Sequence, residues 1–393
     1  MLVFLSALFV AASMARAQES PSLEAVLGGD EVAGYARAQR PHPFTFPLDH
    51  GPHPQFKHEW WYFTGNVSDG HGRDFGFQLT FFRIALSPNK PVRDSAWAAD
   101  QVYMGHFALS DIGAQRFLHV QRFSRAAAGL AGAQVDDDGF RVWLENWQVR
   151  QVAPDLDCLG GGNATDCLAM RLAAIEPDFA LNLSLSSLKP LVLQGEAGLS
   201  RKSPQPGNAS HYYSFTRLAA HGEVSVAGQR FDVSGLAWMD REWSTSALGE
   251  GQVGWDWFAL QFDDGSELMW YDMRRADGRV DPNSQGVLAA ADGAVTRLDA
   301  ADVQVQVIDW WRSPHSGIRY PAHWRLVAPQ HDLSIEVVPR QADQELHETV
   351  MKYWEGAVSV SGTRAGRSVA GTGYVELAGY QHDQADAGRR PND

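Results

Sequence analysis

The chain has 393 residues, which is enough for two domains that each bury a core of their own. Its net charge is −14, with 33 basic against 47 acidic residues, so it lacks the basic surface on which nucleic-acid binding or docking to anionic lipid depends. Hydrophobic content is ordinary for a globular protein at 44%, but 14 tryptophans are unusual, and they cluster near carboxylates.

The N-terminus has the pattern of an export signal. An apolar run from Leu2 to Ala12 is followed by Ala15-Arg16-Ala17, which has the small-x-small form of a signal peptidase site. The run is too short to anchor the chain as a transmembrane helix. We therefore predict a cleavable signal peptide at residues 1–17, a periplasmic or secreted protein, and an N-terminal arm at residues 18–43.

From Phe44 onwards the sequence consists of short alternating segments separated by Gly, Asn, Asp and Pro. Period-two alternation with frequent turn residues is typical of antiparallel strands in sandwiches or barrels. Strong helical periodicity is nearly absent. Asp-Gly pairs, which favour hairpin turns, occur at 69–70, 138–139, 264–265, 277–278 and 292–293. The sequence therefore predicts an all-β protein.

A tryptophan–acid signature occurs twice, first as His58-Glu59-Trp60-Trp61-Tyr62 and again as Asp240-Arg241-Glu242-Trp243. An alternating aromatic segment follows each signature, at 75–83 and at 255–262. We interpret the repetition as two copies of one β-rich unit, each carrying an acid at a similar place. Carboxylates among indoles are costly to desolvate, so they need either a function or a partner.

A second internal similarity relates residues 233–240 to residues 369–376. Both stretches have the order Val, any residue, Gly, any residue, small, aromatic, apolar, acid. An aromatic pair precedes each stretch, Tyr212-Tyr213 in the first case and Tyr353-Trp354 in the second. We expect these two stretches to occupy corresponding strands of two similar units.

The polar, proline-bearing loop at 200–208 is the best candidate for a boundary between these units. We therefore predict one barrel at residues 44–215, a second at residues 216–380, and a polar tail at residues 381–393. Each half is long enough for a barrel of about eight strands, which has no exposed edges and can enclose a small ligand.

The two cysteines, Cys158 and Cys167, flank a glycine-rich stretch. In an exported protein this spacing predicts a local disulfide that closes a hairpin tip. A redox pair or a metal site lacks support, because there is no CxxC motif and no histidine nearby.

Five motifs together resemble the AttH-like, carotenoid hydratase-related (CrtC-like) two-domain lipocalin family, whose members are often labelled "predicted secreted hydrolase". They are KHEWWYFTGN, FGFQLTFFR, YMGHFALSD, WMDREWSTS and GWDWFALQFDDGSELMWYDMR. The resemblance extends from about Phe44 to Tyr380 and implies two lipocalin-like antiparallel β-barrels packed together. It also implies one of two functions. These are hydration of a terminal double bond in a carotenoid or another isoprenoid, and a role beside an envelope ABC transporter.

One stretch departs from the hydratase branch of the family. The hydratases tend to have an Asp-His-Asn-Trp type of stretch where this chain has Asp240-Arg241-Glu242-Trp243. An arginine in place of a titratable histidine removes a proton shuttle. Tyr271 and Asp272 fall in the region where the resemblance implies a catalytic tyrosine and aspartate.

Carboxylic acids among aromatic rings suit the protonation of an alkene. Burial raises the pKa of an acid, which then stays protonated near neutral pH, and aromatic faces stabilise a developing cation. For a hydratase we assign the acid to Asp240 or Asp272, and the orientation of water to Tyr271 or Glu242. In either function the residues expected to contact the ligand are Trp60, Trp61, His106, Trp243, Trp255, Trp257 and Trp270.

The alternative for the two signature glutamates is structural. Glu59 and Glu242 would accept indole N–H bonds or pair with Arg83 or Arg241, and an arginine would stack on a tryptophan. A lone strand histidine such as His106 is also more often a hydrogen-bonded core residue than a catalyst. Three histidines lie close together in the sequence before the first tryptophan pair: His50, His53 and His58. Their spacing matches no zinc motif, so we expect no metal.

The chain has no nucleophile elbow, P-loop or strand-linked dinucleotide motif, so we expect no cofactor. We predict an exported protein that binds a hydrophobic isoprenoid or lipid and serves an envelope ABC transporter. The alternative is a cofactor-free hydratase. Arg241 in place of the histidine favours the first of these functions.

Overall fold

The structure is a computed structural model, and it describes residues 32–89, 95, 97–153, 167–246 and 248–381. The predicted signal peptide at 1–17, most of the arm at 18–43 and nearly all of the tail at 381–393 lie outside these ranges. Cys158 lies outside them too, while Cys167 is disulfide-bonded. Among the described residues, no helix has the length and apolarity needed to span a membrane.

The described residues form twenty-three strands and three single-turn 3-10 helices. The helices are η1 (Leu48–His50), η2 (Ile112–Ala114) and η3 (Pro329–His331). The first sheet contains β1 (His58–Ser68), β2 (Asp74–Ala85), β3 (Gln101–Asp111), β4 (Arg116–Arg125), β5 (Ala131–Asp136), β6 (Gly139–Leu144), β7 (Trp147–Val152), β8 (Ala169–Ile175), β9 (Phe179–Ser187), β10 (Val192–Leu193), β11 (Leu199–Arg201), β12 (Ala209–Val226) and β13 (Gln229–Ser244). The second sheet contains β14 (Gln252–Phe262), β15 (Glu267–Arg275), β16 (Gln285–Ala289), β17 (Val295–Asp299), β18 (Gln304–Arg312), β19 (Arg319–Ala328), β20 (Leu333–Pro339), β21 (Glu345–Leu346), β22 (Tyr353–Arg364) and β23 (Arg367–Ala378).

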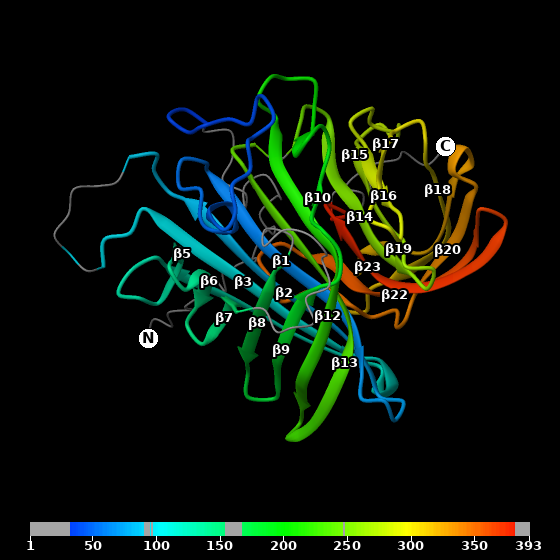
Figure 1. Ribbon diagram of the computed structural model, residues 1–393, viewed down its shortest axis with the longest axis horizontal. Coiled ribbons are helices and arrows are strands. Elements are labelled where there is room, and N and C mark those ends of the chain that lie inside the picture. Colours follow the sequence, from blue (N-terminus) through cyan, green and yellow to red (C-terminus); the bar gives the residue numbers. More distant parts are fainter. Residues whose placement is uncertain (1–31, 90–94, 96, 154–166, 247, 382–393) are drawn as a thin grey trace, which may run out of the picture.

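The two sheets curl into barrel or half-barrel shapes that lie side by side, which confirms the all-β, lipocalin-like prediction (Figure 1). Their strand orders match. The order β4-β3-β2-β1-β13-β12-β9-β8-β7 in the first sheet recurs as β17-β16-β15-β14-β23-β22-β20-β19-β18 in the second. In both, the first strand pairs with the last. The similar stretches at 233–240 and 369–376 lie in the corresponding strands β13 and β23, as the sequence predicts.

The two tryptophan–acid signatures are not copies of one unit, and that interpretation is wrong. They lie on the neighbouring strands β1 and β13 of a single sheet, where Glu59 is paired with Trp243 and Trp60 with Glu242. The first strand of a barrel closes against its last strand, so motifs far apart in sequence become cross-strand neighbours. The chain enters the second sheet only between Ser244 and Gln252, and the boundary predicted at 215/216 falls inside β12.

The hairpin turns lie where the Asp-Gly pairs predict them. The glycines of all five pairs have positive φ, between 74° and 100°. A residue with a Cβ rarely adopts this backbone conformation, which lets the chain reverse within a few residues. Short turns keep consecutive strands adjacent, so each half of the chain is built largely as a meander.

Strand alternation divides the buried side chains among three cores. In β1 and β13, Trp61, Phe63, Met239 and Trp243 enter the interior of the first barrel. The residues between them face the second barrel, and with their counterparts there they form a third core. Period-two alternation therefore gives the central strands two buried faces.

A buried cluster of charged side chains links the two barrels. Glu267 of β15 is fully buried and lies 2.8 Å from the Lys189 ammonium and 2.5 Å from Arg217 Nε, both of which belong to the first barrel. The amide of Gln261 in β14 donates to the backbone oxygens of Thr216 and Ala237, at 2.7 and 3.0 Å. These contacts fix the distance between the barrels and hence the space between them.

The interior of the first barrel holds a fully buried ionic cluster. Glu59 accepts hydrogen bonds from Arg83 and Arg241 and from the His53 backbone amide, and all three charged side chains have no solvent exposure. Arg241 also lies 4.0 Å above the Trp61 ring. The structural alternative for Glu59 is thus confirmed. Two guanidiniums hold the pKa of this carboxyl well below its ordinary value, against the opposing effect of its burial.

Replacing Glu59 by glutamine should destabilise the fold by about 3–5 kcal/mol, because two buried guanidiniums would lose their counter-charge. The matched control is Glu336→Gln, which breaks the exposed pair of Glu336 with Arg325 at 2.7 Å. The control should leave the free energy of unfolding nearly unchanged. Urea denaturation of both variants measures the difference, and equal losses would contradict the importance of the buried cluster.

Candidate functional site

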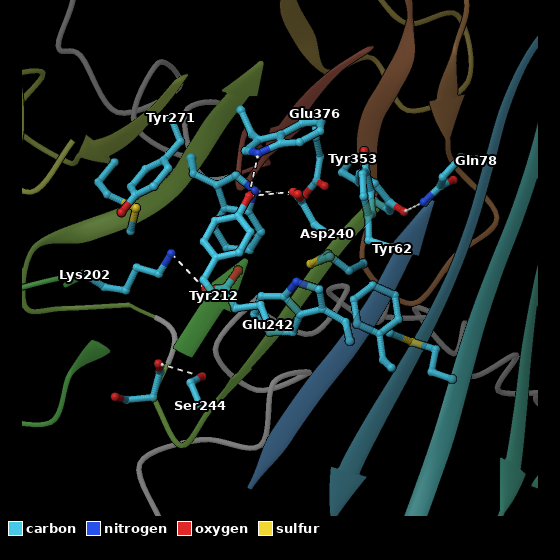
Figure 2. Close-up of a pocket in the computed structure, with 18 residues that line it drawn as sticks. Tyr62, Gln78, Lys202, Tyr212, Asp240, Glu242, Ser244, Tyr271, Tyr353 and Glu376 are labelled. Atoms are coloured by element: carbon cyan, nitrogen blue, oxygen red, sulfur yellow. Dashed lines mark hydrogen bonds and ion pairs between the residues drawn. The ribbon is translucent and has the colours of Figure 1, made fainter. Parts of the chain in front are cut away.

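A cavity lies between the two barrels, where the outward faces of their central strands meet (Figure 2). The space between its walls is at most about 980 Å³, its open mouth included. Aromatic rings and methionines make up most of the wall, together with three carboxyls and one lysine. The lining residues are Trp60, Tyr62, Gln78, Phe82, Met104, Lys202, Tyr212, Asp240, Glu242, Ser244, Ser246, Trp255, Trp257, Tyr271, Met273, Met351, Tyr353 and Glu376.

Asp240 is buried in the cavity wall and is held by three donors. Its Oδ1 accepts hydrogen bonds from the Ser214 hydroxyl at 2.5 Å and from the Trp238 indole at 2.7 Å. Its Oδ2 accepts one from the Tyr212 hydroxyl at 2.6 Å. Burial raises the pKa of Asp240 to about 7, although these hydrogen bonds oppose the shift. Near neutral pH a large share of this group therefore carries a proton.

Glu376 of β23 is the second carboxyl of this kind. Its Oε1 accepts a hydrogen bond from the Trp255 indole at 2.9 Å. Burial raises the pKa of Glu376 to about 7, and the nearby charges of Asp240 and Glu242 add to the rise. Figure 2 shows the carboxyls of Asp240 and Glu376 near each other, one from each barrel. Two like charges at this place would repel, so ionising either acid makes ionising the other harder.

Glu355 of β22 lies just behind the wall and joins these acids. The Tyr62 hydroxyl, which belongs to the first barrel, donates a hydrogen bond to Glu355. Burial raises the pKa of Glu355 well above its ordinary value, and the Glu376 charge contributes to the rise. A short chain of protonatable groups therefore runs from the cavity wall into the core between the barrels.

Glu242 lies two residues beyond Asp240 on the same face of β13 and has a different environment. It lies 3.0 Å from the ammonium of Lys202 and accepts a hydrogen bond from the Ser210 hydroxyl. Burial by itself lowers the pKa of Lys202, but the Glu242 carboxylate raises it overall. The same ammonium lies 4.5 Å from the centre of the Tyr271 ring. This side of the cavity therefore carries a fixed charge pair.

The structure places six of the predicted site residues together on the cavity wall. Strand alternation explains the set, because Trp60, Asp240 and Glu242 occupy the outward positions of β1 and β13. The outward positions of β14 and β15 supply the others. The six residues are Asp240, Glu242, Tyr271, Trp60, Trp255 and Trp257.

Four other predicted residues face away from the cavity. Trp61 and Trp243 belong to the core of the first barrel, and Trp270 belongs to the core of the second. Asp272 lies on the same face as Trp270, whose indole nitrogen is 3.2 Å from it, and opposite Asp256. Burial, aided by the Asp256 charge, raises its pKa to about 7, but it does so inside the second barrel. Each of these residues is adjacent in sequence to a cavity residue. The prediction therefore located the right strands but assigned these four side chains to the wrong face.

Arg241 also faces the interior of the first barrel, where it binds Glu59. Arg241 therefore does not deprive the site of a proton shuttle, because its side chain does not reach the cavity wall. His106 lies one layer behind the wall. It is fully buried, with Nδ1 2.6 Å from the Tyr353 hydroxyl, and matches the structural alternative of a hydrogen-bonded core histidine.

Several wall residues were not predicted from the sequence. Tyr212, Tyr353 and Glu376 belong to the second internal similarity, which by itself predicts only corresponding strands. Lys202 lies in the polar loop at 200–208, whose composition predicts a domain boundary. Tyr62 directly follows the Trp60-Trp61 pair. Combining the repeat with period-two alternation would have identified these positions, except for Lys202, which only tertiary contacts bring to the wall.

The described residues contain one group of histidines and carboxylates with metal-ligand spacing, and it lies in the segment before β1 rather than on the cavity wall. What the cavity offers is an apolar aromatic surface with two acids poised between protonated and ionised forms. A surface of this kind can bury the apolar area of a hydrophobic molecule and can donate a proton.

Comparisons with known proteins agree with this geometry. A solved structure of a candidate AttH protein from Nitrosomonas europaea is 34% identical to this chain, covers 88% of it and 99% of its own length, and has a TM-score of 0.74. Kievitone hydratase from Nectria haematococca is 13% identical, with coverages of 88% and 97% and a TM-score of 0.63. CghA is 14% identical, with coverages of 88% and 96% and a TM-score of 0.50. The last two likenesses concern the fold alone.

No curated protein matches the chain. The AttH-like family, by contrast, matches residues 37–380, which include every strand of both barrels. A match over most of the chain, together with the extent of the likeness to the Nitrosomonas europaea protein, leaves one assignment: this chain is a member of the AttH-like family.

Proposed function

We propose that the chain binds a hydrophobic small molecule, of the isoprenoid or lipid class, in the cavity between its two barrels. The observation that carries this proposal is the composition of the wall. Each barrel contributes large aromatic side chains, including Trp60 and Tyr62 from the first and Trp255 and Trp257 from the second. An apolar cavity with a few placed polar groups is the usual form of a small-molecule site.

The wall also has the adaptability that lipid binding requires. Met104, Met273 and Met351 line the cavity, and a flexible thioether side chain can repack around ligands of different shape. The charge pair of Lys202 and Glu242 lies at one side of the wall, where it would contact the polar end of an amphipathic molecule. Export, predicted from the N-terminal sequence, and association with an envelope ABC transporter, implied by the family resemblance, would make such a protein a periplasmic carrier.

Truncating one aromatic side chain of the wall should weaken binding. Trp60→Ala removes apolar area worth roughly 1.5–3 kcal/mol, or about 10–100-fold in affinity. Binding is followed by fluorescence of N-phenyl-1-naphthylamine and its displacement by geranylgeraniol. The matched control is Trp310→Ala, which truncates a tryptophan that is 44% exposed on β18. Equal affinities in both variants would mean that these probes bind outside the cavity.

A second candidate function is the cofactor-free hydration of an isoprenoid alkene, and the pair of acids favours it. Asp240 would give its proton to the less substituted alkene carbon, where the π electrons form the new C–H bond. The faces of Trp255 and Trp257 stabilise the cation on the neighbouring carbon. Water then adds to that carbon, and its surplus proton returns to the carboxylate, which regenerates the acid.

This candidate predicts that Asp240→Asn abolishes turnover while probe affinity stays within about threefold, because the amide keeps the shape but cannot donate the proton. Loss of a general acid costs about 100–10,000-fold in rate. The protein is incubated with a host lipid extract in ¹⁸O-labelled water, and bound and free lipids are examined by mass spectrometry. A product that carries one labelled water, absent with Asp240→Asn, supports the hydratase. A retained but unchanged lipid supports the carrier instead.

The protonation of Glu376 can be tested without a ligand. Its pKa is raised from 4.5 to about 7, so the stabilisation from the bound proton is complete below pH 4.5 and is lost as pH rises through 7. The wild type should therefore lose on the order of 3 kcal/mol relative to Glu376→Gln between pH 5 and 8. Urea denaturation across this range measures the difference. A difference that does not vary with pH would show that Glu376 is ionised throughout.

A further inference from the structure

Three potential metal ligands come together in the segment that precedes β1, on the far side of the sheet from the cavity. The Nε2 atoms of His42 and His53 each lie 2.9 Å from the same oxygen, Oδ1 of Asp49. All three ligand atoms lie within 4.8 Å of one another. Two imidazole nitrogens and one carboxylate oxygen form a donor set that suits Zn²⁺ and related divalent ions.

The groups behind these ligands hold the His53 ring in place. Its Nδ1 lies 3.3 Å from Glu59 Oε2 and 3.1 Å from Arg241 Nη2, and the ring stacks on Trp243 at 3.7 Å. A carboxylate behind a ligating histidine fixes the orientation of the ring and makes its free nitrogen more basic. The other oxygen of Asp49 accepts a hydrogen bond from the Thr45 backbone amide, which leaves Oδ1 directed at the two histidines.

A third histidine completes the surroundings. His211 of β12 packs against His42, with ring centres 5.2 Å apart, and its side chain is nearly all buried. Its Nδ1 is buried without a hydrogen-bond partner. Since buried polar atoms normally have a partner, this nitrogen is available to a water or another group that enters beside His42. The side chain of His42 is 31% exposed, so an ion can reach the ligands from solvent.

We propose that His42, Asp49 and His53 bind a divalent transition-metal ion of the Zn²⁺ class. The site is separate from the cavity and independent of the function proposed for it. Bound metal would tie residues 42–53 to the interior of the first barrel through Glu59 and Trp243. A set of three protein ligands also leaves a coordination position for water.

The structure shows why the sequence alone pointed away from this site. His50 and His58, which lie near His53 in the sequence, have other surroundings. His50 Nδ1 lies 2.6 Å from the Tyr213 hydroxyl, and both ring nitrogens of His58 are buried without a hydrogen bond. His42 joins His53 only because the chain folds back around η1, and its spacing to His53 matches no familiar zinc motif.

The test uses the full chain without an affinity tag, depleted of metal with EDTA. Titration with Zn²⁺ by calorimetry, and with Co²⁺ by visible absorption, should give one site per chain, and His42→Ala should weaken it at least about tenfold. The matched control is His71→Ala, which removes an exposed histidine from the turn between β1 and β2 and should leave affinity unchanged. His42 is partly exposed, so its variant should keep the wild-type circular dichroism spectrum.

Asp49→Asn provides a second variant, because it removes the charged ligand while it keeps the size of the side chain. Zn²⁺ should raise the melting temperature of the wild type and of His71→Ala, but not that of Asp49→Asn. Absence of Zn²⁺ and Co²⁺ binding to the wild type would overturn the proposal. So would equal affinities of the wild type and His42→Ala. In either case the three residues would form only a hydrogen-bonded cluster.

Discussion

The constraint on which the structure depends is that the central strands of both barrels are buried on both faces. Residues of β1 and β13 pack alternately into the first barrel and against the second. Their counterparts β14 and β23 do the same from the other side. Because side chains alternate with a period of two residues, the odd positions of each strand face one environment and the even positions face the other. The cavity lies between the barrels because the acids and large rings at the positions that face the other barrel do not fill the space completely.

The two faces of these strands shift the pKa of their carboxyl groups in opposite directions. Inside the first barrel, two arginines keep Glu59 ionised. On the outward face, Asp240 and Glu376 have hydrogen-bond donors, but no described lysine or arginine forms an ion pair with either, and burial raises their pKa to about 7. Desolvation acts on all three groups, so the difference arises from the presence or absence of a nearby guanidinium. One face thus uses an acid to hold the fold together, and the other provides acids that can exchange protons.

The duplicated strand order gives this arrangement a simple origin in the chain. Asp240 and Glu376 occupy equivalent places in β13 and β23, and the two barrels meet with these strands near each other. Tyr212 and Tyr353 occupy equivalent strands as well and both line the cavity. A duplicated unit that packs against its own copy therefore brings an acid and a tyrosine into the site from each barrel. Lys202 has no such twin, which distinguishes one side of the cavity from the other.

Much of this protein is determined by the sequence alone. Period-two alternation and Asp-Gly turns predict the strands and hairpins, because both follow from local backbone geometry. The repeat at 233–240 and 369–376 predicts the equivalence of β13 and β23, and family motifs predict paired barrels. These features also bring six predicted residues to one wall, including Asp240, Glu242 and Tyr271.

Tertiary structure alone decided which face of each strand meets the ligand space. The sequence around the residues that face away from the cavity is as rich in aromatic and acidic residues as the sequence around the wall residues. The former are Trp61, Trp243, Trp270 and Asp272, and only the packing of the two barrels distinguishes them from the wall residues. The same holds for His42 and Asp49, which no local pattern joins to His53. A strand buried on both faces has no polar side in its sequence, so its alternation marks two faces without saying what each one meets.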